Sequence, residues 1–261
     1  MPERYHVDSL AVEVHSDRWS LGAAAARCAA EAIGHAVAES GAAAVIFASA
    51  VSQNEFLETL RTLPGIDWTR ITVFHLDEYL GIGRDHPASF RRYLAEHLVD
   101  HVPARQFHEL RGDATDPEAE CVRYERLLRE ANPALVALGI GENGHLAFID
   151  PAECDFDDSR DVRVVDLDET CRRQQVHDGA FESLAAVPSR ALSLTIPVFL
   201  RTPRVVACVP GFTKKESVKT ALEGPVVESC PASVLRRHSG ANLFLDADSA
   251  ALLTRVRRQK T

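Results

Sequence analysis

Residues 43–76 read AAVIFASAVSQNEFLETLRTLPGIDWTRITVFHL, and the order of patterns in this stretch decides the fold class. A short apolar run at 43–47 and a second one at 71–76 are each suited to a buried strand. Between them, residues 56–63 place apolar side chains at helical spacing, and Pro64-Gly65 ends that helix. Strand, helix and strand in this order favour a parallel sheet with helices on its faces.

The same alternation continues on both sides of this stretch. Helices are expected at 16–39 with Ser16 as N-cap, after Pro87, from Asp116-Pro117 to about 130, and at 213–222, with further strands at 135–138, 192–196, 205–209 and 242–245. Residues 151–190 are polar, and we expect loops and a helix there that cover a pocket. No internal repeat, linker or composition break interrupts the sequence, so a single α/β domain over residues 1–261 is predicted.

Composition and charge exclude several classes of protein. Of the 261 residues, 46% are hydrophobic and 26% are charged, which is an ordinary globular balance, and the formal net charge is -9. A surface of that sign repels nucleic acid and anionic lipid, so neither is an expected partner, although a local positive pocket still accommodates a phosphorylated small molecule. The first residues contain no apolar run of signal-peptide type, and the six scattered cysteines contain no Cys-x-x-Cys pair. We therefore expect a cytoplasmic protein with reduced thiols and no metal site.

Polar side chains follow three of the predicted strands at the points where these strands end. Ser49 and Ser52 follow the first strand, and Asp77-Glu78-Tyr79 follows the second. Residues 142–145 follow the third strand, with Asp150 a little further on. Ligands of open parallel sheets bind beyond the carboxyl ends of the strands, so we expect the three clusters to converge at one edge of the sheet.

Each cluster also has a purely structural interpretation. Ser52 opens a capping-box sequence and would then serve as a helix N-cap, although free N–H groups at a helix start also hold phosphate. Asp77 and Glu78 are equally consistent with loop acids bonded to the backbone, and a lone His145 is more often structural than catalytic. The glycines at 139–144 do not form a dinucleotide fingerprint. The residues alone predict a soluble α/β enzyme that handles a small anionic substrate.

Three longer motifs extend this interpretation. The first is Phe74–Gly81 followed by His86–Phe90, an aromatic-x-x-Asp-Glu-Tyr segment and then His-Pro-x-Ser-aromatic. The second is Gly139–Pro151, a glycine-rich turn that runs into Gly-His-x-Ala-Phe, and the third and looser one is Gly211–Lys214 with Glu223-Gly224 downstream. In order and spacing, over about residues 40–248, these motifs resemble the glucosamine-6-phosphate deaminase family of the superfamily that also holds 6-phosphogluconolactonases.

The resemblance implies a modified doubly wound, Rossmann-like sheet, no cofactor, and a defined reaction. Glucosamine 6-phosphate is opened, isomerised from aldose to ketose and deaminated to fructose 6-phosphate and ammonia. Asp77 then occupies the position of the base that moves a proton from C2 to C1. His145 occupies the position of the acid–base group in ring opening, and Asp150 that of the carboxylate that orients it.

For the phosphate, the resemblance points to Lys214, with Ser49, Ser52 and nearby N–H groups completing the cradle. Gly144 is a further expected substrate-binding position. An arginine of the family that contacts the phosphate falls near Arg172 and its neighbour, and we take Arg172 as the candidate. The expected partner is a phosphosugar, and homo-oligomerisation, which is frequent in the family, stays open.

Two positions depart from the family pattern. Asn143 stands where the family has an aspartate before Gly-His, as in a branch with Glu-Asn-Gly-His, and an amide cannot act as a base. Ala50 and Val51 stand in the family's glycine-rich phosphate turn, where side chains restrict close approach to an anion. Two alternatives therefore remain beside the deaminase. One is hydrolysis of 6-phosphogluconolactone, and the other is a sugar-phosphate-binding regulator without catalysis.

Overall fold

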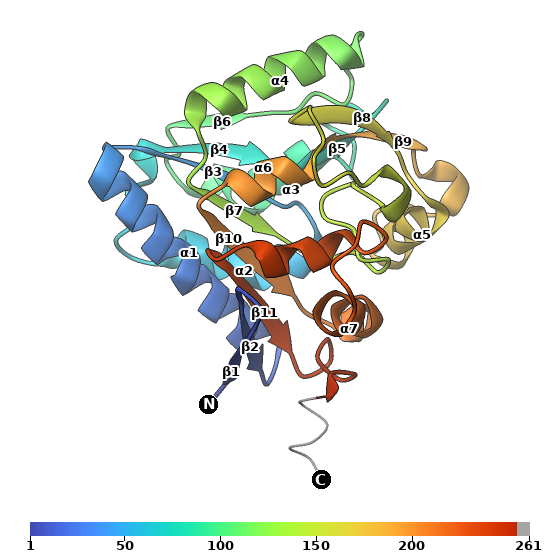
Figure 1. Cartoon of the computed structure of the whole chain (residues 1–261). Helices are drawn as coiled ribbons and strands as arrows, with labels where there is room; N and C mark the ends of the chain where they lie inside the picture. The colour runs from blue at the N-terminus through green and yellow to red at the C-terminus, as the bar shows by residue number, and fades with distance from the viewer. Residues whose placement is uncertain (255–261) are drawn as a thin grey trace.

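An eight-stranded sheet forms the centre of the computed structural model, which describes residues 1–254 (Figure 1). The strand order is β1-β2-β11-β10-β7-β3-β4-β6, and all neighbours are parallel except β1 and β2. The strands are β1 (Glu3–Val7), β2 (Leu10–His15), β3 (Ala43–Phe47), β4 (Ile71–His75), β6 (Gln106–His108), β7 (Leu135–Leu138), β10 (Arg204–Val209) and β11 (Ala241–Asp246). The predicted mainly parallel fold is confirmed, although β1, β2 and β6 were not expected.

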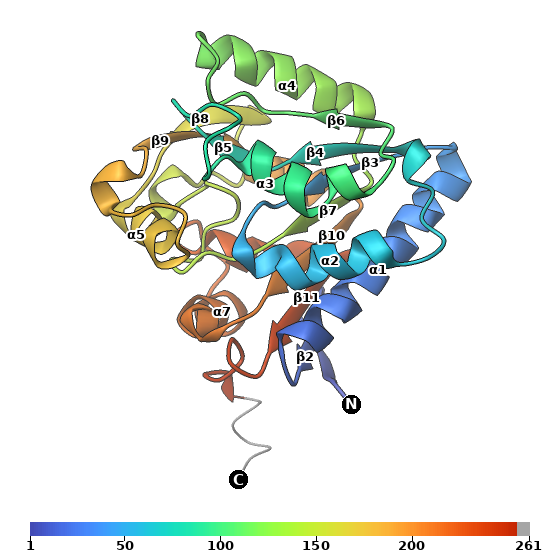
Figure 2. The same ribbon diagram turned by 180° about the vertical axis from the view of Figure 1, so that it is seen from behind.

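Helices cover both faces of this sheet. Figure 1 looks onto the face with α4 (Pro117–Ala131), α6 (Ile196–Arg201) and α7 (Lys215–Glu223), and Figure 2 onto the face with α1 (Arg18–Ser40), α2 (Asn54–Thr62) and α3 (Phe90–His97). Strand β3 shows why both faces are buried: Val45 and Phe47 pack with α1 and α2, while Ala44 and Ile46 pack on the opposite side. Because successive side chains of a strand point to opposite faces, a continuous apolar run requires cover on both.

The winding of the sheet reverses between β3 and β7. From β3 the chain proceeds outward through β4 to β6, and from β7 it proceeds the other way through β10 to β11. Such a reversal is the topological switch point of a doubly wound sheet, and the crevice beyond its carboxyl ends is the usual ligand site.

A second, three-stranded antiparallel sheet corrects the sequence prediction at the Asp-Glu-Tyr motif. It consists of β5 (Asp77–Tyr79), β9 (Arg190–Leu194) and β8 (Val162–Asp166), in the order β5-β9-β8. The motif is therefore a short strand of another sheet and not the end of β4. Leu76 makes the crossing, because its N–H donates to Phe47 of the main sheet while its carbonyl accepts from Leu194.

Helix starts differ from the sequence prediction at two places. Asp17, not Ser16, caps α1, and its side chain accepts from the N–H of Ser20. The capping box predicted at Ser52 is wrong, because a 3₁₀ turn (η1, Val51–Gln53) precedes α2, and Glu55 pairs instead with Arg18 of α1 at 2.8 Å. The helix predicted from Asp116-Pro117 begins as expected, with Asp116 as its cap.

Within residues 1–254, no helix combines the length and the apolar character needed to cross a bilayer. The six cysteines are all unpaired. The segment 151–190 contains the expected helix, α5 (Glu169–His177), together with strand β8.

Candidate active site

A small pocket of about 60 Å³ lies beyond the carboxyl ends of β10, β7, β3 and β4, at the switch point of the sheet. It brings together predicted site residues that are far apart in sequence: Ser49, Ser52, Asp77, His145 and Lys214. The predicted convergence of the three polar clusters is thus confirmed. Small-molecule sites commonly measure roughly 300–1,000 Å³, so this pocket is small for a hexose phosphate.

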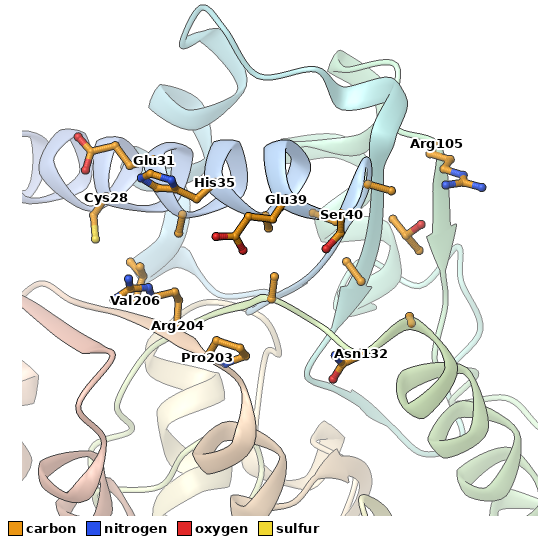
Figure 3. Close-up of a pocket in the computed structure, with 18 of the residues that line it drawn as sticks. Cys28, Glu31, His35, Glu39, Ser40, Arg105, Asn132, Pro203, Arg204 and Val206 are labelled. Atoms are coloured by element: carbon orange, nitrogen blue, oxygen red, sulfur yellow. The ribbon is translucent and has the colours of Figure 1, made fainter.

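A larger depression of about 1070 Å³ lies at the opposite edge of the sheet, where the strands begin (Figure 3). Its walls are the second half of α1, the end of α4 at Asn132 and the start of β10 at Arg204. Volume alone would favour this depression. We place the candidate active site in the smaller pocket, because the acid, the histidine and the lysine of the motifs line that pocket and not the larger one.

Asp77 is the pocket carboxyl with the most unusual environment. It is the first residue of β5, its exposed fraction is 6%, and it lines the pocket wall. Burial, together with the neighbouring charge of Glu78, raises the pKa of Asp77 well above its usual value. A carboxyl with a raised pKa in a pocket is a candidate for proton transfer.

His75 fixes the backbone that carries Asp77. Its Nδ1 lies 3.0 Å from the carbonyl of Asp77, and its Nε2 accepts from the N–H of Leu110 at 2.8 Å. Burial lowers the pKa of His75 to about 3, so the ring is neutral and Nδ1 is the donor. This histidine supports the strand crossing and does not line the pocket.

Glu78 and Tyr79 have roles different from that of Asp77. The carboxylate of Glu78 is fully buried and accepts from Ser89 Oγ at 2.8 Å and from the side chain of Arg91 at 3.2 Å. It also accepts from two backbone N–H groups at the start of α3. Tyr79 donates from its hydroxyl to Gln175 of α5 at 2.6 Å. Ser89 of the His-Pro-x-Ser element and Arg91 just after it thus satisfy the buried Glu78.

His145 packs against the glycine-rich loop after β7. A Cβ atom on Gly141 would lie 2.2 Å from the imidazole ring, so only glycine leaves room for this ring position. Nδ1 of His145 lies 3.2 Å from Oδ1 of the buried Asp150, but the angles are not those of a hydrogen bond. Burial raises the pKa of Asp150, but its contacts with His145, Asn143 and the N–H of Asp168 together outweigh burial and hold it below its usual value.

Asn143 bridges two carboxylates behind this pair. Its Nδ2 donates to Asp150 Oδ1 and to Asp168 Oδ2, both at 2.8 Å, and its Oδ1 accepts from the N–H of His145 at 3.1 Å. The N–H of Asp168 also donates to Asp150 at 2.9 Å. An aspartate at position 143 would place another hydrogen-bond acceptor against the carboxylate oxygens of Asp150 and Asp168, which are themselves acceptors. Asparagine at position 143 is therefore complementary to the carboxylates of Asp150 and Asp168.

Lys214 is the cation of the pocket. It ends the 3₁₀ turn η6 (Phe212–Lys214) before α7, and its exposed fraction is 6%. Burial lowers its pKa, against the opposing charges of Asp178 and Glu142. Lys215 lies over the ring of Phe212, so the interpretation as a solvated helix lysine fits Lys215 and not Lys214.

The loop after β3 supplies neutral polar groups. Ser49 Oγ and Gln53 Oε1 are buried and have no hydrogen-bond partner among residues 1–254. Ser52 Oγ accepts from Gln53 Nε2 at 3.0 Å. The positive-φ residues of the described chain do not include Ala50 or Val51, so this turn does not require the glycines of the family.

The structure does not bring Arg172 to the pocket. Its Nη2 donates to the carbonyls of Leu184 and Val187 at 2.7 and 3.0 Å, which ties α5 to the following segment. Gly144 also does not line the pocket. A glycine is favoured there because φ is +88° and because a Cβ atom would lie 3.1 Å from Cys230 Sγ. Both residues have structural roles here.

Sequence reasoning missed the contribution of α5. Gln174, Gln175 and Asp178 line the pocket, and Asp168 caps the helix by accepting from the N–H of Cys171 at 2.7 Å. The signal that could have found this helix is Asp168 followed by Glu169, an N-cap with an acid in the first turn. Ala147, between His145 and Asp150, has a φ of +52°, an uncommon conformation that often occurs at functional sites.

The chain is thus an α/β protein whose motif residues line a pocket at the switch point of its sheet. The profile of the family described as glucosamine-6-phosphate isomerases/6-phosphogluconolactonase matches residues 16–244, and the chain belongs to this family. Glucosamine-6-phosphate deaminase of Exiguobacterium sibiricum is 34% identical over 189 residues, which are 72% of this chain and 73% of the relative. The enzyme of Bacillus cereus is 36% identical over 188 residues, 72% and 70% of the two chains.

Solved structures agree with this assignment. A monomeric glucosamine-6-phosphate deaminase superposes with a TM-score of 0.85 at 31% identity, covering 92% of this chain and 99% of that one. A 6-phosphogluconolactonase from Trypanosoma brucei gives a TM-score of 0.76 at 20% identity, covering 97% and 100%, and shares the fold.

Proposed function

We propose that this protein is a cytoplasmic enzyme that converts glucosamine 6-phosphate to fructose 6-phosphate and ammonia, with residues 1–261 as one sugar-phosphate isomerase/deaminase domain. The observation that carries the proposal is the placement of Asp77, His145 and Lys214 around one switch-point pocket. The family membership and the two deaminase relatives support the same reaction.

Ring opening is the first step in this proposal. His145 lines the pocket with its ring while Nδ1 is turned to Asp150, so the opposite ring nitrogen is the one available to the sugar. It transfers a proton between the anomeric hydroxyl and the ring oxygen, and the charge of Asp150 stabilises the imidazolium that forms. Asn143 fixes the position of Asp150 relative to His145, because it donates to the Asp150 carboxylate and accepts from the backbone N–H of His145.

Proton transfer on the open sugar follows. The substrate enters as the ammonium form, and Asp77 removes the proton on C2 while the aldehyde oxygen O1 takes up a proton from that ammonium group. Asp77 then returns its proton to C1, which leaves a CH2OH group at C1 and an iminium group at C2. Water adds to C2, and ammonia leaves to give the ketose. The buried position of Asp77 raises its basicity and keeps the proton from exchanging into bulk water.

The direct test is ammonia release from glucosamine 6-phosphate by the purified protein. Ammonia release supports the deaminase activity. Ammonia release by a variant that lacks the Asp77 carboxyl would exclude Asp77 as the base. Hydrolysis of 6-phosphogluconolactone in place of ammonia release would assign the lactonase activity. Binding of the phosphosugar with neither reaction would assign a non-catalytic regulator.

Lys214→Met is expected to raise KM for the phosphosugar with little change in kcat. A charge-assisted hydrogen bond contributes about 1.5–3 kcal/mol, which corresponds to a change of about 10–150-fold in binding. Lys215→Met is the matched control. Lys215 directly follows Lys214, but its ammonium group lies over the ring of Phe212 and does not line the pocket. Equal KM values for the two variants in the ammonia-release assay would exclude Lys214 as the phosphate ligand.

Asn143→Asp is expected to lower kcat by about 10–100-fold, the range typical of lost orienting hydrogen bonds. The change places a third carboxyl against Asp150 and Asp168 and removes both Nδ2 donors. Combining it with Asp168→Asn restores a donor and is expected to recover part of the loss. Steady-state rates of ammonia release by the single and double variants measure this loss and recovery. Wild-type turnover of Asn143→Asp would show that the hydrogen bonds from Asn143 to Asp150 and Asp168 are dispensable.

A further inference from the structure

Three side chains with metal-binding atoms meet directly behind the candidate active site. They are His145, Asp150 and Cys171, from the loop after β7, the end of that loop and the first turn of α5. All three are buried, and their ligand atoms lie within 4.8 Å of one another. The sequence did not predict this cluster, because no pair of these residues has the spacing of a common zinc motif.

The distance between the histidine and aspartate ligand atoms matches a small tetrahedral site. Zinc binds imidazole nitrogen and carboxylate oxygen at about 2.1 Å, so two such ligands are about 3.4 Å apart around one ion. Nδ1 of His145 and Oδ1 of Asp150 are 3.2 Å apart. The Cys171 thiol completes three protein ligands and leaves a fourth position for water.

Nδ1 of His145 is the second observation that points to a ligand. It is buried and has no hydrogen-bond partner in the part of the chain that the structure describes. Two potential acceptors this close need a proton or a cation between them. A nitrogen, an oxygen and a sulfur ligand form the mixed set that favours zinc over magnesium or calcium.

The surroundings are already arranged as an outer shell of such a site. Asn143 donates to Asp150 Oδ1 at 2.8 Å, and the N–H of Asp168 donates to its Oδ2 at 2.9 Å. The side chain of Asp168 accepts from the N–H of Cys171 at 2.7 Å, which fixes the first turn of α5. Hydrogen bonds of this kind orient metal ligands and hold their charge.

We propose that His145, Asp150 and Cys171 form an inhibitory site for a zinc-type divalent cation. The ion coordinates Nδ1 of a neutral ring that carries its proton on Nε2, together with a carboxylate oxygen and the thiolate, and the thiol proton leaves to solvent. Coordination occupies the His145–Asp150 pair, so a protein with bound metal cannot open the sugar ring. The binding site stands on the geometry, and its inhibitory effect rests on the proposed deaminase function.

The test uses the full chain with Zn²⁺ and Co²⁺ salts as probes. Titration is expected to show one tightly bound equivalent, and Co²⁺ to give the intense spectrum of a tetrahedral site with a thiolate charge-transfer band. Cys171→Ser is expected to abolish that band and to weaken Zn²⁺ binding by about 100-fold or more, beyond the range seen for outer-shell partners. Cys121→Ser, at another buried helix cysteine outside the cluster, is the matched control.

Two results would overturn the site: equal Zn²⁺ affinity in the two cysteine variants, or a Co²⁺ spectrum without the thiolate band. Inhibition has its own readout, since Zn²⁺ should stop ammonia release and a chelator should restore it. Metal binding at the cluster without inhibition would overturn the inhibitory role. If the protein releases no ammonia at all, the deaminase proposal fails while the cobalt spectrum still decides the metal site.

Discussion

Asp77→Asn is expected to lower kcat for ammonia release by about 10²–10⁴-fold, the range that general acid–base catalysis contributes. An amide has nearly the shape of the carboxyl but cannot accept the C2 proton. The carboxyl lies in the pocket wall at the start of β5, and His75 holds its backbone, so the substitution leaves the fold and the pocket in place. Phosphosugar binding, measured by calorimetry, should change little.

The pH dependence of the wild type gives an independent check on Asp77. Its pKa is raised by burial, and the base has to be ionised, so activity is expected to rise as pH rises through a value above the ordinary carboxyl range. The acid limb of kcat/KM should therefore lie higher than that of an exposed aspartate. An acid limb in the ordinary carboxyl range, or near-wild-type turnover of Asp77→Asn, would assign the base to another group.

Arg91→Met is expected to lower the free energy of unfolding by about 3–5 kcal/mol, the cost of leaving a buried charge without its partner. The exposed side-chain fractions of Arg91 and Glu78 are 3% and 0%. Arg91 also donates to the carbonyl of Ile82 at 3.0 Å and pairs with Asp113 at 2.9 Å. Its loss therefore loosens the start of α3 and the strand that carries Asp77.

The matched control is the next residue, Arg92→Met. Arg92 pairs with Glu96 one turn away on the exposed side of α3, and such surface pairs contribute less than about 1 kcal/mol. Urea unfolding of both variants measures the difference. Similar unfolding midpoints for the two variants would show that the Glu78–Arg91 pair is replaceable. Glu78 of the Asp-Glu-Tyr motif would then have no stabilising role.

The alternation of strands and helices was readable from the sequence because it depends on short-range patterns. The run 43–47 is apolar throughout, which requires cover on both faces wherever the strand lies in the sheet. Residues that follow strand ends, such as Asp77 and His145, could be placed at one edge because parallel strands share their direction.

The chain alone did not reveal which of these polar residues share one environment. Asp77 and Glu78 are neighbours, yet Asp77 lines the pocket and Glu78 pairs with Arg91, because β5 leaves the main sheet. Arg172 was expected at the phosphate, but the carbonyls that follow α5 bind its guanidinium. Neither outcome follows from local spacing.

Sequence by itself therefore determined the fold class, the family motifs and the edge of the sheet where the chemistry lies. Tertiary structure alone decided that Asn143 bridges Asp150 and Asp168, and that Cys171 meets His145. The physical reason is that helical and strand patterns arise from residues close in sequence. A buried polar group, in contrast, is satisfied by whichever partner the packing of distant segments brings within hydrogen-bond distance.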